Sequence, residues 1–345
     1  MEQDMKQKVN NVGIDLAKNV FHLVGTDTRG TILWRKRLAR NALMPFMAQL
    51  PPVTIGMEAC GGSHYWARQF RQQGHDVKLM APQFVKPYVK SNKNDMRDAE
   101  AIAEAVTRPT MRFVPIKEVD QQDIQALHRI RARLMKERTA LINEMRGLLG
   151  EYGIVLPKGV TQLRKGLLGK LEEEQAKLTP LSEEVFHRLF NELVKLEEQI
   201  AYYDAKLKAM ATSHPECLRL LTIPGIGPLS ATALVAAMRD ASAFKNGRQF
   251  AAWLGLVPRQ HSTGGQTNLL GISKRGDSYL RKLLIHGARA TLRWADLKTD
   301  RRSQWIRELI ARRGSNRAAV AVANKNARIV WALLSRGGVY QEAAD

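Results

Sequence analysis

The chain has 345 residues, of which 44% are hydrophobic, and its 54 Lys and Arg against 33 Asp and Glu give a formal net charge of +21. This apolar content excludes global disorder, and the length predicts two or three domains. Such a basic chain is typical of proteins that meet a polyanion such as nucleic acid, with a generally basic surface as the alternative.

Cysteine content and hydropathy indicate the compartment. Cys60 and Cys217 stand alone, which gives neither a disulfide framework nor a zinc site and suits a reducing cytoplasm. No apolar run reaches the roughly 18 residues that a membrane span needs. The polar residues 1–10 lack the apolar core of a signal peptide. We therefore expect a soluble, cytoplasmic protein that does not enter a membrane.

The first part of the chain, residues 1–115, predicts an α/β domain. Residues 10–38 indicate two or three strands joined by tight turns, followed by a short helix at about 41–50. Further strands are predicted at 53–58 and 76–80, and helices at 63–73 and 95–107. Hairpin strands followed by strand–helix alternation predict a mixed sheet with helices on its faces.

Residues 116–212 predict a helical coiled-coil arm. Two long charged helices are expected at 118–153 and about 180–212, interrupted near residues 157–159. Their apolar stripes have heptad-like spacing, which suits an antiparallel arm or an oligomerising coil. The first stripe comprises Leu127, Ile130, Leu134, Leu141, Ile142, Met145 and Leu148, and the second comprises Leu189, Leu193, Leu196, Ile200 and Leu207.

The last part, residues 213–345, predicts a mainly α-helical domain with a strong positive charge. Residues 241–345 contain 19 Lys and Arg but only 6 Asp and Glu, so they hold +13 of the +21. Apolar periodicity predicts its helices at 228–238, 246–254, 276–295, 303–312 and 316–336.

Four carboxylates follow the expected strands or open a helix of the first domain. Asp15 and Glu58 each end an apolar strand, and Asp95 and Asp98 lie three residues apart at the start of a helix, on one face. Convergence at the strand ends would require divalent cations, and Mg²⁺ prefers such oxygen ligands. One or two ions there could act on a phosphodiester.

Three of these four acids also have a simpler interpretation. Asp95 and Asp98 could be N-terminal caps of their helix, favoured by the macrodipole. Glu58 could be a solvated strand end. Asp15 directly follows a buried run and is harder to explain this way. The order Asp, Glu, Asp-x-x-Asp on this topology favours a metal site.

Two segments in the last domain are candidates for binding nucleic acid. Residues 222–228 (TIPGIGP) resemble a helix–hairpin–helix turn in which Gly225 and Gly227 let a backbone phosphate approach; a plain Pro/Gly turn is the alternative. Residues 262–265 (STGG) place hydroxyls in a Gly-rich loop, where a base or metal would have to activate one for attack; an ordinary flexible loop is the alternative. Candidate phosphate-binding cations nearby are Arg259, Lys274, Arg275, Arg281 and Lys282.

Three segments carry a family resemblance. Residues 13–18 (GIDLAK), 57–61 (MEACG) and 92–99 (NKNDMRDA) resemble the motif blocks of the Piv invertase and the related DEDD insertion-sequence transposases. The resemblance covers nearly the whole chain and implies an RNase H-like, RuvC-like domain, a coiled-coil arm and a transposase domain, in that order. It assigns Asp15, Glu58, Asp95 and Asp98 as the metal-binding acids, with Lys18 of the first block as a candidate nucleic-acid contact.

The resemblance also implies covalent chemistry at the Gly-rich loop. The family's nucleophile is a serine before a glycine, after a Gly-Leu-x-Pro-Arg stretch, and it forms a phosphoserine link to DNA. Ungapped counting places Thr263 at that position, whereas a shift of one residue places Ser262 there; we favour Ser262, with Ser273 as a weaker candidate. The site would be composite, with the acids of one subunit meeting the serine of another.

The expected partners follow from the same resemblance. They are DNA, as element ends and target, a structured guide RNA, and further copies of the chain in a dimer or tetramer. Two other functions stay open: a RuvC-type metal-dependent nuclease or resolvase acting by water attack, and a non-enzymatic architectural protein. No histidine is assigned a role, although His261 adjoins the serine.

Overall fold

The computed structural model describes residues 8–90, 94–238 and 241–341, in two compact units, Met1–Val119 and Asp120–Asp345. Residues 1–7 of the polar N-terminal segment and Asn92 and Lys93 of the third motif block lie outside the described residues. No helix in the described part of the chain is long and apolar enough to cross a bilayer.

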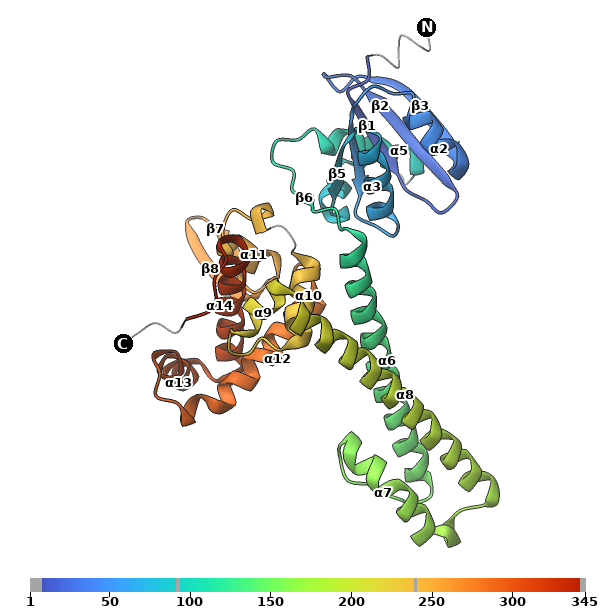
Figure 1. Cartoon of the computed structure of the whole chain (residues 1–345), viewed down its shortest axis with the longest axis vertical. Helices are drawn as coiled ribbons and strands as arrows, with labels where there is room; N and C mark the ends of the chain where they lie inside the picture. Colours follow the sequence, from blue (N-terminus) through green and yellow to red (C-terminus); the bar gives the residue numbers. More distant parts are fainter. Residues whose placement is uncertain (1–7, 91–93, 239–240, 342–345) are drawn as a thin grey trace. The chain divides into compact units, whose positions relative to one another are not determined.

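The first unit contains a six-stranded mixed sheet with strand order β3-β2-β1-β4-β5-β6 (Figure 1). β1 pairs antiparallel with β2 and parallel with β4, β2 pairs antiparallel with β3, β4 parallel with β5, and β5 antiparallel with β6. The strands are β1 (Asn11–Asp15), β2 (Val20–Thr26), β3 (Ile32–Ala39), β4 (Thr54–Glu58), β5 (Asp76–Met80) and β6 (Phe113–Val114). The predicted mixed sheet is confirmed, and β6 is the strand that the sequence did not reveal.

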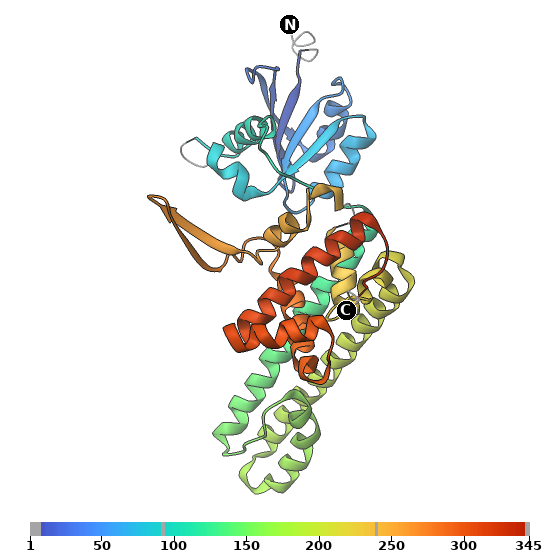
Figure 2. The same ribbon diagram turned by 90° about the vertical axis from the view of Figure 1, so that its left-hand side faces the viewer.

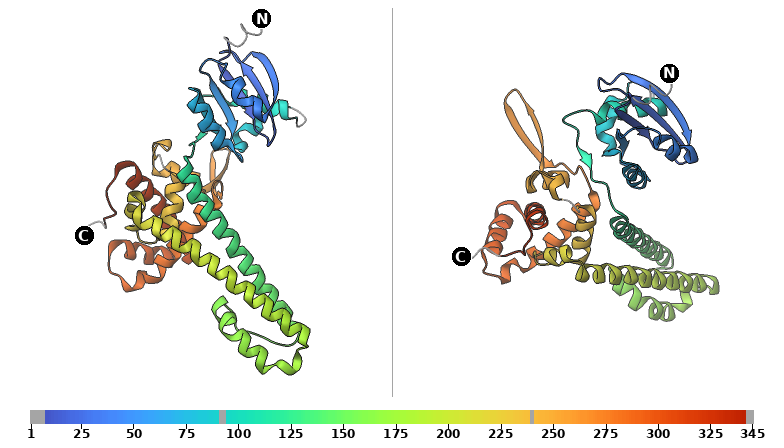
Figure 3. Two further views of the ribbon diagram at one scale, coloured as in Figure 1. Left: turned by 45° about the vertical axis from the view of Figure 1, so that its right-hand side comes forward. Right: turned by 45° about the horizontal axis from the view of Figure 1, so that its top comes forward.

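Helices cover both faces of this sheet (Figure 3). α2 (Arg40–Met47) and α3 (Ser63–Gln72) pack on one face, where their Leu43 and Phe70 join Ile14 and Leu23 of the strands in one core. α5 (Asp95–Val106) packs on the other face against β1, β2 and β4. A short α4 (Pro82–Val85) and a 3₁₀ turn at Lys86–Tyr88 lead toward it.

The second unit begins with a helical arm formed by α6 (Val119–Glu151), α7 (Val160–Glu173) and α8 (Pro180–Ser213). Both predicted long helices are present, but the interruption between them holds a further helix, α7, whose Leu163, Leu167 and Leu171 are buried in the core of the arm. The predicted stripe is wrong at Leu148, which is 39% exposed; Leu149 is buried instead.

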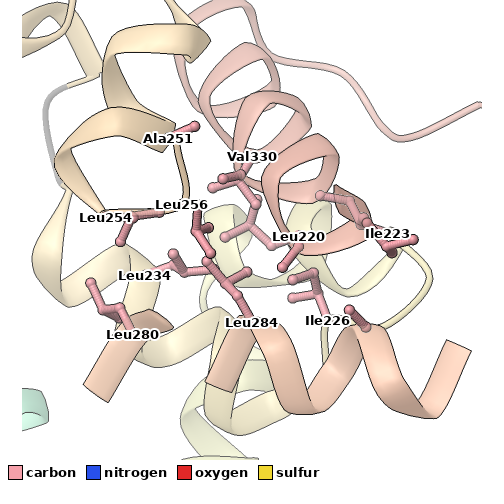
Figure 4. Packing of buried hydrophobic residues seen from close by; sticks show 14 of the residues in the cluster. Leu220, Ile223, Ile226, Leu234, Ala251, Leu254, Leu256, Leu280, Leu284 and Val330 are labelled. Carbon is pink, nitrogen blue, oxygen red and sulfur yellow. The ribbon is translucent and has the colours of Figure 1, made fainter. Parts of the chain in front are cut away.

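The rest of the second unit is mostly helical, as predicted. Its helices are α9 (Pro215–Leu221), α10 (Pro228–Ala237), α11 (Gly247–Trp253), α12 (Ser278–Trp294), α13 (Arg301–Arg313) and α14 (Ser315–Arg336). Apolar side chains from the region of α9 through α14 form one core, part of which Figure 4 shows. α9 was not predicted; Pro215 at its first turn starts a new helix immediately after α8.

The expected Gly-rich loop is a β-hairpin. β7 (Pro258–Thr263) and β8 (Gln266–Ile272) pair antiparallel, and the loop is reduced to the two-residue turn Gly264-Gly265. Both glycines have positive φ, 55° and 76°, as in the turns that match the twist of a hairpin. The hairpin projects from the helices of its unit (Figure 2), and nearly all its residues are exposed.

Candidate functional site

Three of the four predicted acids come together. Asp15 ends β1, and Asp95 and Asp98 lie in the first turn of α5. One carboxylate oxygen from each lies within 4.8 Å of the other two, so small side-chain shifts would bring all three onto a shared cation. Carboxylate oxygens are the donors that hard divalent cations such as Mg²⁺ and Mn²⁺ accept. The group therefore fits a divalent cation by donor type and spacing.

Glycines in the strands allow α5 to reach this position. Gly13 lies two residues before Asp15 and therefore on the same face of β1. A Cβ atom at Gly13 would lie 2.3 Å from the carbonyl oxygen of Ala99 and 2.4 Å from the amide nitrogen of Ala103. A Cβ atom at Gly56, two residues before Glu58, would lie 2.9 Å from the Val106 side chain. The helix backbone thus lies directly on β1, and its first turn lies beside the strand ends.

Asn94, and not Asp95 or Asp98, is the N-terminal cap of α5. The Asn94 side chain accepts a hydrogen bond from the amide of Met96 at 2.9 Å and is the N-cap of α5. The cap position is therefore filled without Asp95 or Asp98. Both carboxylates still gain from the positive end of the helix dipole, which lowers the cost of holding them near Asp15.

Glu58 lies next to the group but is not one of the three. The parallel register pairs Ile14 with Met57, which places Glu58 beside Asp15 at the adjacent strand end. Burial raises the pKa of the neighbouring Cys60 thiol, and the negative charges of Glu58 and Asp15 raise it further. Both carboxylates therefore act on the same small region, although Glu58 has no oxygen within the 4.8 Å group.

His22 is a residue of this site that the sequence analysis missed. In the β1–β2 register His22 stands directly opposite Asp15, and its Nδ1 lies 3.9 Å from Oδ2 of Asp95. The sequence predicts strands on both sides of a turn here, but only the register of the pair shows that His22 lies across from Asp15. Lys18, in the connection between these strands, is exposed, and its carbonyl accepts a hydrogen bond from Arg40.

Ser262 and Thr263 lie at the end of β7, next to the turn. Ser262 pairs with Thr267 and Thr263 with Gln266. Because side chains alternate along a strand, the two hydroxyls are directed to opposite faces of the hairpin. The Gln260 side chain, on the same face as Ser262, donates a hydrogen bond to Ser262 Oγ at 2.7 Å. His261 adjoins Ser262 in sequence but lies on the opposite face.

The base of the hairpin is fixed by close backbone packing. A Cβ atom at Gly255 would lie 2.2 Å from the Arg275 carbonyl oxygen, and one at Gly276 would lie 1.8 Å from that of Trp253. Ser273 donates its amide to Val257 in the same connection. Lys274 has φ 54°, unusual for a residue with a side chain, and is exposed.

The candidate cations divide into exposed and engaged side chains. Arg259, Arg275 and Lys282 are exposed, together with Lys274. Arg281 instead donates from one guanidinium nitrogen to the carbonyls of Leu254 and Arg275, so this group holds the connection to α12.

In the Pro-Gly turn before α10, Gly225 packs against another helix, while Gly227 is exposed at the start of α10. Gly225 has φ 89° and meets Gly287 of α12 so closely that a Cβ atom on Gly287 would lie 1.9 Å from the Gly225 carbonyl oxygen. Gly225 is therefore required for helix packing. Gly227 is exposed at the N-cap of α10, with open space around its Cα.

Comparison with known families gives two matches. A model described as "Transposase IS116/IS110/IS902 family" matches residues 217–305, and the DEDD_Tnp_IS110 model, described as "Transposase", matches residues 12–154. The second match spans the acids and suggests an RNase H-like fold for the first unit. A DEDD family also implies the use of a divalent metal, which agrees with the group formed by Asp15, Asp95 and Asp98.

Individual relatives align over nearly the entire chain. The "Probable family 20 transposase" of Pseudomonas aeruginosa is 52% identical over 96% of this chain and 99% of its own length. The "Transposase for insertion sequence element IS1111A" of Coxiella burnetii is 50% identical over 96% and 91%, and that for IS1328 of Yersinia enterocolitica is 43% identical over 97% and 99%. With matches of this length and identity, the chain belongs to the IS116/IS110/IS902 family of insertion-sequence transposases.

Proposed function

We propose that this transposase cuts and rejoins DNA through a covalent phosphoserine intermediate, with Ser262 as nucleophile and Asp15, Glu58, Asp95 and Asp98 as the metal-binding acids. The observation that carries the proposal is the approach of three carboxylates, from β1 and α5, to within 4.8 Å of one another. Like charges at that spacing are costly without a cation. One or two Mg²⁺ ions are the proposed occupants.

The acids have distinct parts in this proposal. Asp15 is anchored by the sheet, while Asp95 and Asp98 are carried by a helix whose position depends on two strand glycines. Glu58, at the adjacent strand end, would complete the set when a cation or a DNA phosphate draws it in. A divalent cation bound there supplies charge neutralisation and Lewis acidity to a phosphodiester.

Ser262 would perform the transfer in two balanced steps. Its Oγ attacks phosphorus, the hydroxyl proton passes to a base, and the P–O bond to one sugar breaks as that sugar oxygen gains a proton. A sugar hydroxyl of the second strand then attacks the phosphoserine and releases the serine. The number of phosphodiester bonds is conserved, so the exchange needs no external energy source.

Ser262 is preferred to Thr263 on chemical and structural grounds. A primary hydroxyl is less hindered than the β-branched one of threonine. Ser262 Oγ already accepts a hydrogen bond from Gln260, which holds the oxygen in place. A serine hydroxyl is weakly nucleophilic on its own, so activation must come from a base or cation outside the hairpin. We place that base or cation at the acid site of another subunit, which makes the proposed active site composite.

The proposal includes a guide RNA and an oligomer. Residues 241–345 carry a net +13, which suits contact with nucleic-acid backbones while base pairing reads the sequence. A two-stranded hairpin exposed on both faces is marginally stable alone, so β7 and β8 are expected to gain a partner on assembly. On the arm, Leu181 and Val185 lie one turn apart on α8 and are 71% and 39% exposed, as a contact between copies would require.

Variants in a strand-exchange assay test this proposal. With donor and target DNA, the cognate RNA and Mg²⁺, we expect Asp15→Asn and Ser262→Ala each to abolish exchange. Thr267→Ala, the hydroxyl opposite Ser262 in the hairpin, is the matched control and should retain activity. Cleavage that survives Ser262→Ala but not Asp15→Asn would instead indicate a RuvC-type nuclease acting by water attack, since the acids assemble within one unit.

A further inference from the structure

We propose that His22 supplies a nitrogen ligand to the cation held by Asp15 and Asp95, so that the site binds Mn²⁺ more tightly than the acids alone would. The inference rests on the proposed metal site and adds a ligand that the four-acid motif does not contain. It concerns a residue on β2, whereas the acids come from β1, β4 and α5.

The sheet places His22 on the face that carries the acids. His22 and Asp15 are direct partners in the antiparallel β1–β2 pair, so their side chains project from the same face. Two residues along β2, Val24 packs against Ala99 and Ala103 of α5. His22 therefore stands beneath the first turn of the helix that carries Asp95 and Asp98.

The separation of His22 and Asp95 suits two ligands of one ion. Nδ1 of His22 lies 3.9 Å from Oδ2 of Asp95, too far for a hydrogen bond. First-row divalent cations bind imidazole nitrogen and carboxylate oxygen at about 2.1 Å, so two ligands of one ion lie at most about 4.2 Å apart. The observed distance lies within that limit, so one cation can contact both atoms.

The His22 nitrogen also lacks a hydrogen bond within the described part of the chain. Nδ1 is buried and has no hydrogen-bond partner among the residues that the structure describes, and the side chain is 15% exposed. Buried polar atoms nearly always have a partner, and each exception calls for an explanation such as an ion. In contrast, the buried ring of His75 contacts backbone atoms of both Val53 and Met47. The partner expected for His22 is the cation.

A nitrogen ligand changes how strongly the site distinguishes Mn²⁺ from Mg²⁺. Carboxylates and water suit Mg²⁺ and Mn²⁺ alike, whereas imidazole favours transition metals over Mg²⁺. Mg²⁺ also gives up its water shell reluctantly. Removal of His22 should therefore weaken Mn²⁺ binding much more than Mg²⁺ binding.

Electron paramagnetic resonance of Mn²⁺ bound to the full-length protein without DNA tests this directly. We expect the wild type to show ¹⁴N coupling from a directly bound imidazole. His22→Asn, which offers an amide oxygen in its place, should lose this coupling and about tenfold in Mn²⁺ affinity, with Mg²⁺ affinity changed less than about threefold. His187→Ala, at an exposed histidine of α8, is the matched control and should leave both properties unchanged.

The remaining outcomes separate this inference from the proposed metal site. Bound Mn²⁺ without ¹⁴N coupling, or with coupling that persists in His22→Asn, would overturn the role of His22 and leave the acid site standing. Equal losses of Mn²⁺ and Mg²⁺ affinity would make His22 a structural residue only. Failure of the wild type to bind either metal, as expected for Asp15→Asn, would overturn the metal site itself. Circular dichroism of His22→Asn verifies its fold.

Discussion

At the scale of single residues, the site depends as much on glycines as on acids. Gly13 and Asp15 are two residues apart on β1, as are Gly56 and Glu58 on β4, and alternation puts each glycine on the same face as its acid. The absence of Cβ atoms lets α5 lie close to the strands. The Gly-x-acid spacing therefore links helix packing to ligand placement.

Gly13→Ala tests this link. The new Cβ would meet the backbone of α5 at Ala99 and Ala103, which cannot move aside as a flexible side chain would. We expect a loss of about 1–3 kcal/mol of unfolding free energy, as for other overpacked cores, and weaker Mn²⁺ binding because Asp95 and Asp98 shift. Gly61→Ala is the control, since a Cβ at Gly61 has open space. Unchanged metal affinity in Gly13→Ala would show that this packing does not position the ligands.

The sequence predicted the acids better than their surroundings. Asp15, Asp95 and Asp98 could be predicted because a carboxylate after a buried run, and a pair spaced i and i+3, are local patterns. His22 could not be assigned without the strand register, since its significance comes from the partner opposite it and from a helix about 70 residues later. The distance of Glu58 from the other acids is likewise a matter of side-chain position that no local pattern contains.

At the scale of elements, the β7–β8 hairpin has no buried face, so its conformation depends mainly on its turn. Gly264 and Gly265 both have positive φ, a conformation that asparagine tolerates and β-branched residues do not. We expect Gly265→Val to reduce strand exchange at least tenfold, because a hairpin without a core cannot offset a strain of about 1–3 kcal/mol. Gly265→Asn should keep most of the activity. Equal activity of the two variants in the exchange assay would rule out a need for this turn.

A second element-scale feature is the junction of α6 with α10 and α12. His128 is buried on α6, with its two ring nitrogens 2.9 Å from the Tyr279 hydroxyl and 3.0 Å from the Thr232 hydroxyl. Burial, together with the positive charge of Arg131, lowers the pKa of His128 to about 4. The junction is therefore built for a neutral histidine.

The pH dependence of unfolding follows from this pKa. As pH falls below 6.5 the unfolded chain takes up a proton that folded His128 takes up only near pH 4, so the stabilisation is complete above pH 6.5 and is lost on the way to pH 4. We expect chemical denaturation to show that the free energy of unfolding is lower at pH 5 than at pH 7.5, with about 2 kcal/mol of the difference due to His128. His128→Gln should show a correspondingly smaller loss, and His187→Gln should behave as wild type. An undiminished loss in His128→Gln would assign the effect elsewhere.

Elements with strong apolar periodicity were predictable, and elements without it were not. The helices of the arm and the C-terminal core bury one face each, which leaves a pattern in the sequence. The hairpin buries neither face, so β7 and β8 show no apolar period and their residues predict only a loop. The Pro-Lys-Gly segment before α7 predicts a break and gives no sign of the helix that follows. Heptad spacing predicts Leu148 in the buried stripe, but this spacing drifts along a straight helix, and Leu149 is buried instead.

At the scale of the whole molecule, the positive charge predicts salt-dependent DNA binding. The net +21 and the exposed Lys274 and Arg275 beside the hairpin suit phosphate contacts. Each phosphate contact contributes about one unit to the slope of log affinity against log salt. We expect the double variant Lys274→Ala and Arg275→Ala to reduce that slope by about two. The double variant Lys158→Ala and Lys165→Ala, on the arm, is the control for a loss of two charges. An equal reduction of the slope in this control would show that Lys274 and Arg275 have no special part in DNA binding.

The whole-molecule claim is that an acid-bound cation and a hairpin serine together exchange DNA strands. Trapping the protein on DNA that carries its element ends, with the RNA and Mg²⁺ present, and mapping any denaturation-resistant adduct by mass spectrometry tests this most directly. We expect a phosphodiester link to Ser262 that is absent in Ser262→Ala and in Asp15→Asn. Free cleaved ends with no adduct, lost in Asp15→Asn, would contradict serine chemistry, and an adduct on Thr263 would contradict the choice of nucleophile.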